Sequence, residues 1–143
     1  MRQECVELLV MLVVVIRIYL VLMPLKASGC FSTAVRGHLC FAHVGATAGP
    51  ITGAERVLLG NPDVLIIGVG GGSKIYDAQE AAELVNQLNP RRVIPVQYVN
   101  GEPPDNCDQT DVQPFLDAMA GTTVRNVGRT LSLPGSLGDS TVI

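Results

Sequence analysis

The sequence predicts an α/β protein, because short apolar strand-like runs alternate with helix-like segments along residues 37–143. Residues 64–69 form a continuous apolar run bounded by an aspartate and glycines, which is typical of a central strand covered on both faces. Residues 77–88 place apolar side chains at the spacing of one helix face. At 143 residues a single domain is expected, preceded by a distinct apolar segment at residues 1–36.

The first elements of this domain follow in order. Residues 37–43 alternate loosely between apolar and polar types and predict a strand, which the following Gly and Pro residues end. Thr52 and Glu55 form a capping-box pattern, and Gly60 suits the C-terminal cap. This pattern predicts a short helix with residues 57–59 on its apolar side.

A second capping box begins the next helix. Asp77 and Glu80 have the required spacing, and the helix is expected to end before Pro90. Residues 92–98 then resume an extended pattern. Pro95 restricts that strand to an edge, an end or a bulge, because proline has no N–H group to donate to a neighbouring strand.

A third helix is predicted near the C-terminus. Thr110 and Gln113 cap it, and Gly121 follows its end. Short β-like pieces punctuated by glycine and proline complete the chain, at residues 122–127, 129–133 and 140–143.

The N-terminal segment contains an apolar run at residues 8–23 that is interrupted by Arg17. As a helix it would span about 24 Å, less than the hydrocarbon core of about 30 Å. Its assignment stays open between a membrane anchor, a signal, a buried strand and a non-native start. A cytoplasmic location is expected, with membrane association through residues 8–23 as the alternative.

Charge and cysteine content exclude several classes of protein. The net charge is −3, only 4% of residues are aromatic and there is no Trp, so a nucleic-acid-binding surface is not expected. The four cysteines, Cys5, Cys30, Cys40 and Cys107, show no C-x-x-C pair and no spacing of a secreted miniprotein. They are therefore expected to be buried or inert thiols.

A glycine-rich turn follows the apolar run at residues 64–69. Gly71, Gly72 and Ser73 precede a helix, where backbone amides attract anions, so they form a candidate anion-binding site. The spacing does not match a Walker loop or a dinucleotide fingerprint, and a simple tight turn is the favoured interpretation. Farther along, Asp105, Asp108 and Asp111 are interpreted as a solvated acidic loop because they do not follow an EF-hand pattern.

One strand carries three residues of metal-ligand type. The two-residue period of a strand places His38 and Cys40 on one face and His43 on the other, so a single site built from all three is not expected. His38 and Cys40 are interpreted as half-buried strand residues. His43 is the stronger candidate because it precedes a glycine-rich loop, where functional residues tend to lie.

Several segments together resemble a known family. They read HVGATAGPIT, NPDVLIIGVGGG, IYDAQEAAELVNQLNPRRVIPVQY, GRTLSL and LGDSTVI. Over residues 37–143 they are similar to the C-terminal half of metallo-β-lactamase-fold hydrolases, in the branch that resembles ascorbate-6-phosphate lactonase. The resemblance implies part of an αββα sandwich and a metal pair, usually zinc, that activates water for hydrolysis.

This chain departs from the family at the positions that hold metal. Residues 1–36 contain no histidine and therefore no H-x-H-x-D-H motif. Ala46 stands where the family has a bridging aspartate, and Gln97 stands where it has a histidine ligand. Of the ligand-region positions only His43 keeps its type. The resemblance thus implies zinc, while the residues offer too few donors to hold it.

The prediction that follows is a truncated, degenerate relative of a zinc-dependent hydrolase, with little or no hydrolysis in this chain. Zinc is expected from the family, and the alternative that this chain binds none stays open. Half a sandwich has exposed sheet edges, so a second chain or a missing N-terminal half is an expected partner. Two alternatives stay open. One is a non-enzymatic, membrane-tethered α/β interaction module, and the other is an anion-binding domain that uses the turn at residues 70–74.

Overall fold

The structure is a computed structural model that describes residues 35–36, 39–44, 48–103, 105–134 and 136–143. The apolar run at residues 8–23 and the candidate positions His38 and Ala46 lie outside these ranges. A mixed sheet has the strand order β1-β2-β3-β4. Its strands are β1 (Val35–Arg36), β2 (Leu39–Val44), β3 (Val64–Gly68) and β4 (Arg92–Val96).

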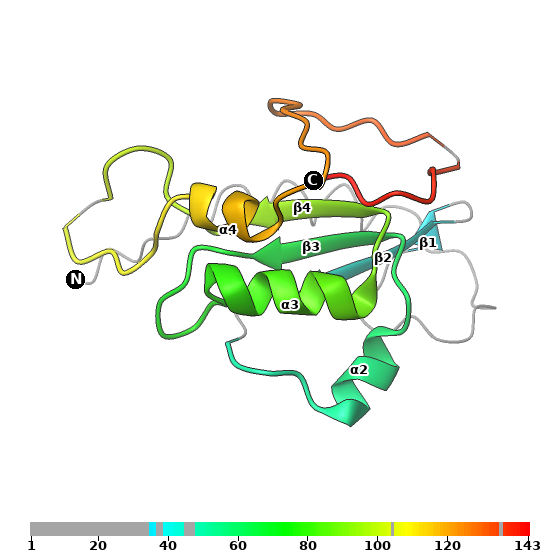
Figure 1. Ribbon diagram of the computed structural model, residues 1–143, viewed down its shortest axis with the longest axis horizontal. Coiled ribbons are helices and arrows are strands. Elements are labelled where there is room, and N and C mark those ends of the chain that lie inside the picture. Colours follow the sequence, from blue (N-terminus) through cyan, green and yellow to red (C-terminus); the bar gives the residue numbers. More distant parts are fainter. Residues whose placement is uncertain (1–34, 37–38, 45–47, 104, 135) are drawn as a thin grey trace.

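The three longer strands of this sheet run parallel, and β1 pairs antiparallel with β2 (Figure 1). All five residues of β3 are buried, as predicted for a strand flanked on both sides. In the register of the sheet, Ile66 on β3 pairs with His43 on β2 and with Ile94 on β4. Pro95 lies in β4, the last strand of this order, which confirms its expected edge position.

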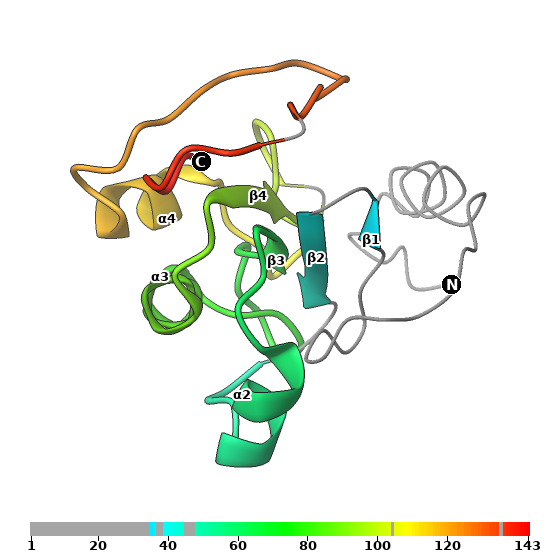
Figure 2. The same cartoon turned by 90° about the vertical axis from the view of Figure 1, so that its right-hand side faces the viewer.

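Within the described residues three helices accompany the sheet: α2 (Gly53–Leu59), α3 (Ala78–Leu88) and α4 (Gln113–Ala118). Helices α3 and α4 lie on the same face of the sheet, as Figure 2 shows, and α2 lies farther from the strands, below α3 in that view. The main core forms between that face and the two helices. Its largest fully buried members include Tyr76, Phe115, Leu65, Ile67 and Leu88.

The opposite face of the sheet carries a smaller apolar cluster. Leu39 and Val64 pack with Leu137 from the C-terminal segment, and Phe41 and Ile94 pack against them while partly buried. Strand alternation explains the division, because neighbouring residues point to opposite faces. The described part of the chain therefore forms a mixed α/β layer with a helix-covered face and an apolar face.

Both predicted capping boxes are present. The Asp77 side chain accepts hydrogen bonds from the Gln79 and Glu80 amides, and Glu80 accepts one from the Asp77 amide. Helix α3 ends at Asn89 in the left-handed conformation, immediately before a proline as predicted. Thr52 and Glu55 form the same arrangement at the start of α2.

The short helix predicted between Thr52 and Gly60 is confirmed as α2. None of its residues is fully buried: Val57 is 76% exposed, and Leu59 packs against the main core while partly buried. Two predictions about the remaining elements are wrong. The expected cap at Thr110 is absent, since its amide and hydroxyl donate to the Gly70 carbonyl and α4 begins at Gln113. The C-terminal β-like pieces form only isolated bridges in the described residues, where Val142 pairs with Arg92 and Thr123.

The cysteine prediction is also wrong for the two cysteines that the structure describes. Cys40 and Cys107 are both disulfide-bonded, and neither is a free thiol. Sequence spacing did not reveal this, because disulfide pairing depends on which distant segments the fold brings together.

Candidate functional site

The candidate site lies where the parallel strands end. The carboxyl ends of β3 and β4 meet at one edge of the sheet, followed by the glycine-rich turn after β3 and by Gln97 after β4. In open parallel sheets this edge is where ligands commonly bind, because loops converge there. The amide of Val69 donates to the carbonyl of Val96 at 3.1 Å, which continues the pairing of the two strands up to the site.

Gln97 is held in an unusual backbone conformation. Its φ is +55°, a left-handed value that few non-glycine residues adopt. The side-chain Oε1 atom is buried and has no hydrogen-bond partner. A carbon atom added at Gly68 would lie 2.6 Å from this oxygen and 2.7 Å from Cγ2 of Ile75. The amide therefore occupies space that a side chain at Gly68 would otherwise take, and its oxygen is turned toward the sheet.

Gly70 permits a second close approach to the same residue. A carbon atom added there would overlap the carbonyl oxygen of Gln97 and lie 3.0 Å from Cα of Tyr98. Both obstacles are backbone atoms, which cannot move independently of the chain. Two glycines thus allow the segment after β4 to pack directly on the segment after β3.

The glycine-rich turn already binds a carboxylate from its own chain. The Ser73 amide donates to Oδ2 of Asp108 at 3.2 Å, and a carbon atom added at Gly72 would lie 2.7 Å from the same carboxyl group. Gly71 and Gly72 both have positive φ values, +75° and +86°. Ser73 is the described residue of this turn whose amide binds the carboxylate, whereas the Gly71 amide donates to the Tyr76 carbonyl at 2.9 Å. Binding of an external anion at Gly71, Gly72 and Ser73 stays a prediction.

The loop that carries Asp108 is tied to the site by further hydrogen bonds. The Thr110 amide donates to the Gly70 carbonyl at 2.7 Å, and the Val99 amide donates to the Thr110 carbonyl at 2.9 Å. The expectation of a purely solvated acidic loop is therefore wrong for Asp108, although its side chain is exposed.

His43 lies near the carboxyl end of β2, the strand next to β3. It pairs in register with Ile66, two residues before Gly68. Strand alternation puts its side chain on the same face as Phe41, the face opposite α3. Partial burial lowers the pKa of His43 below its ordinary value of 6.5, because desolvation disfavours the charged imidazolium. At neutral pH the imidazole is therefore neutral, the form that can ligate a metal.

The donor set does not fit a zinc ion. Structural and catalytic zinc sites need three or four protein ligands of His, Cys, Asp or Glu type. Among the residues that the structure describes, no group of three such side chains could hold a metal ion. Gln97 contributes only a neutral amide oxygen, and that atom is buried beside Gly68. Ala46 has a methyl group, which cannot act as a ligand whatever its position.

Sequence reasoning identified Gln97 only as a substituted position. It missed the left-handed backbone, the unpaired Oε1 atom and the bond between Ser73 and Asp108. One available signal was the pair of glycines, Gly68 and Gly70, within an otherwise apolar strand end, since glycine there often marks a close backbone approach.

Comparison with a known structure shows the same architecture. A crystal structure from Thermotoga maritima, of a proposed Zn-dependent hydrolase of the metallo-β-lactamase superfamily, superposes with a TM-score of 0.63 at 26% sequence identity. The match covers 73% of this chain and 52% of the other, so this chain spans about half the length of that protein. A search of curated proteins gave no significant match.

The sequence also matches a family model. The match extends over residues 25–97, half of the chain, and the family is described as a beta-lactamase superfamily domain. It includes β2, β3, α3 and β4, whose order and packing are given above. The chain therefore belongs to the β-lactamase superfamily, as the resemblance of its sequence indicated.

Proposed function

We propose that this chain is a degenerate member of the β-lactamase superfamily that retains the packing of its fold and does not hydrolyse substrates by itself. The observation that carries the proposal is Gln97. A neutral amide stands at the family's histidine ligand position, and its one potential donor oxygen is buried and unpaired against Gly68. A metal ion there would have to draw that oxygen out of the protein and still lack other strong ligands.

Chemistry at the remaining positions supports the same conclusion. A metal-dependent hydrolase must hold the ion firmly and leave a coordination position open for water. Ala46 removes the bridging carboxylate that the resemblance implies, and His43 alone supplies an imidazole within the described residues. One imidazole and one amide cannot do both tasks. We also propose that this chain belongs to the branch of the superfamily that resembles ascorbate-6-phosphate lactonase. The segments NPDVLIIGVGGG and IYDAQEAAELVNQLNPRRVIPVQY support this assignment.

The decisive experiment measures zinc binding by the full-length chain. We expect isothermal titration calorimetry and elemental analysis to find no tightly bound zinc, and assays with lactone and phosphodiester substrates to find no turnover. Tight binding of two equivalents together with turnover would refute the proposal. Turnover that appears only on addition of a second chain bearing an H-x-H-x-D-H motif would assign hydrolysis to an assembled pair.

Restoring the ligands gives a positive control. The variant that combines Ala46→Asp with Gln97→His should bind zinc more tightly than the natural chain, because it regains a carboxylate and an imidazole. Histidine is well suited to position 97, since it tolerates a left-handed backbone better than most residues. Gln79→His, on the exposed surface of α3, is the matched control for an added imidazole and should leave zinc affinity unchanged.

A second candidate function rests on the apolar run at residues 8–23. In this proposal the run tethers a non-enzymatic α/β interaction module to a membrane. Within the ranges described by the structure, no helix is long and apolar enough to cross a bilayer. Cell fractionation tests the run itself. A tethered chain stays in the membrane pellet after a high-salt wash, and loses that association when residues 8–23 are deleted.

A further inference from the structure

The connection between β4 and α4 leaves the candidate site and returns to it. The Val99 amide donates to the Thr110 carbonyl at 2.9 Å, and this hydrogen bond closes the base of the loop. In Figure 1 the chain beyond that base extends away from the sheet. Asn100 is the first residue past the closing bond, and Gly101 follows it. A change to the main chain at Asn100 therefore acts directly beside a contact of the candidate site.

Asn100 and Gly101 make few contacts. Both residues are exposed, and neither makes a hydrogen bond with another described residue. A carbon atom added at Gly101 would have no atom within 4 Å, and the φ of +95° at this residue is one that glycine adopts without steric cost. The Asn100 side chain and the Gly101 amide can therefore rotate toward each other, because loop residues with so few contacts are weakly restrained.

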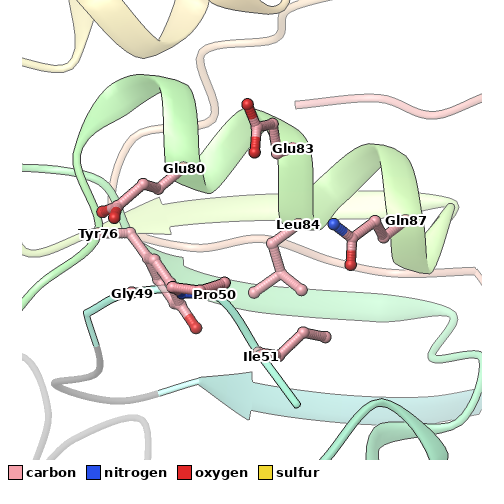
Figure 3. Close-up of a pocket in the computed structure, with 8 residues that line it drawn as sticks. All are labelled: Gly49, Pro50, Ile51, Tyr76, Glu80, Glu83, Leu84 and Gln87. Atoms are coloured by element: carbon pink, nitrogen blue, oxygen red, sulfur yellow. The ribbon is translucent and has the colours of Figure 1, made fainter. Parts of the chain in front are cut away.

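The other five asparagines of the sequence lack this combination. Two precede proline, which has no main-chain amide hydrogen. One lies in α3, next to the Gln87 that Figure 3 labels, where helical hydrogen bonds hold the main chain. The last two precede cysteine and valine, whose side chains hinder approach to the amide, and Asn126 also accepts a hydrogen bond from the Gly128 amide at 3.2 Å. These five positions are Asn61, Asn89, Asn86, Asn106 and Asn126.

We propose that Asn100 is a site of spontaneous deamidation and isomerisation. The Gly101 main-chain nitrogen loses its proton and attacks Cγ of Asn100, which forms a new C–N bond. The bond between Cγ and Nδ2 breaks, and ammonia leaves with that proton. Water then opens the succinimide ring: attack at Cγ yields aspartate, and attack at the main-chain carbonyl carbon yields isoaspartate. In isoaspartate the main chain passes through Cβ and Cγ and is longer by a methylene group.

Isoaspartate would alter the candidate site through the closing hydrogen bond. The extra methylene group follows Val99, whose amide binds the Thr110 carbonyl, and the Thr110 amide in turn binds the Gly70 carbonyl at 2.7 Å. Both products also place a new carboxylate in a loop that already carries several acidic side chains. Like charges repel each other, so the modification should loosen the segment that brings Asp108 to the glycine-rich turn.

The test follows the full-length chain during incubation at neutral pH and physiological temperature. Tandem mass spectrometry locates the mass increase that accompanies replacement of an amide by a carboxylate, and methylation by an isoaspartyl O-methyltransferase detects isoaspartate. We expect both signals at Asn100, with Asn126 as the internal control that stays unchanged over the same period. Gly101→Ala should slow the reaction by about tenfold, a barrier increase of about 1.4 kcal/mol, because its methyl group hinders approach to the amide. Asn100→Gln should remove the signal.

The rate in urea separates the chemistry of the sequence from the structure of the loop. Because no described contact restrains these two residues, the folded and unfolded chains should react at rates within about tenfold of each other. A folded chain that reacts more slowly than this, or equal rates for Gly101→Ala and the natural chain, would overturn the proposal. Circular dichroism checks that Gly101→Ala is folded.

Hydrogen exchange measures the effect on the candidate site. The isoaspartyl form, separated from the unmodified chain by ion-exchange chromatography, should exchange the Val99 and Thr110 amides faster in NMR spectra. Equal exchange in the two forms would overturn the inferred effect on the site.

Discussion

Replacement of Gly70 by alanine should destabilise the protein more than any other single methyl addition at the candidate site. The new carbon atom would overlap the Gln97 carbonyl oxygen and approach Cα of Tyr98 at 3.0 Å. Overpacking typically costs about 1–3 kcal/mol, and the upper end applies where the obstacle is backbone. We therefore expect a loss of about 3 kcal/mol in the free energy of unfolding, or about 10 °C in melting temperature for a chain of this length.

Gly68→Ala gives a graded comparison. Its obstacles are the ends of two side chains, Oε1 of Gln97 and Cγ2 of Ile75, which can rotate away, so a loss of about 1–2 kcal/mol is expected. Adding Gln97→Ala should recover part of the loss in Gly68→Ala and none of it in Gly70→Ala, because the second contact involves the main chain of residue 97. Double-mutant cycles can resolve coupling of this kind.

Urea denaturation followed by circular dichroism measures these changes, with Gly53→Ala as the control. Gly53 begins α2 with no atom within 4 Å of the added carbon, so its substitution should change stability by less than about 1 kcal/mol. If Gly70→Ala were as stable as the natural chain, the close approach of the two strand ends would be wrong, and with it the placement of Gln97.

Three further predictions address other parts of the molecule. Asp77→Ala should lower the unfolding free energy by about 1 kcal/mol, whereas Thr52→Ala should have a smaller effect because its helix buries no residue; equal losses in urea denaturation would contradict this. The pKa of His43 is lower in the folded state than its ordinary value of 6.5, so the unfolded chain binds more protons between the two values. Stability should therefore be fully present above pH 6.5 and fall as the pH drops below it, and unfolding curves at several pH values should show this fall disappear in His43→Gln. Asp108→Asn should speed hydrogen exchange of the Ser73 amide, and unchanged exchange by NMR spectroscopy would show that the carboxylate does not hold the turn.

Local patterns predicted the elements whose stabilising contacts are themselves local. Both capping boxes join residues three positions apart, and their geometry follows from the first turn of the helix alone. The sequence also predicted the buried strand β3, because a continuous apolar run of that length is typical of a strand covered on both faces. In each of these cases the sequence segment contains nearly all the information that fixes the structure.

Predictions failed where a distant segment competes for the same groups. Thr110 has the residue type and spacing of a helix cap, yet its amide and hydroxyl bind the carbonyl of Gly70, 40 residues away. Helix α2 was predicted correctly as a capped helix, but how far its apolar side is buried depends on the surface that the fold places opposite it: Leu59 packs against the main core, and Val57 remains 76% exposed. A local sequence pattern limits the conformations and hydrogen bonds that a segment can adopt, and tertiary contacts select one of them.

At the candidate site, Gln97 combines one feature that the sequence predicts with one that depends on tertiary contacts. The resemblance of the sequence to the family implies that an amide stands at position 97 where the family has an imidazole. The sequence does not reveal that the backbone there is left-handed, with φ of +55°, because this conformation depends on how β4 meets the glycine-rich turn. Such a conformation is costly for a residue other than glycine and persists only when the surroundings impose it. Gly68 and Gly70 permit the close approach that imposes this backbone on Gln97. In the proposed function the missing ligands are side chains only, so a histidine introduced at position 97 would enter a main-chain conformation that this chain already has.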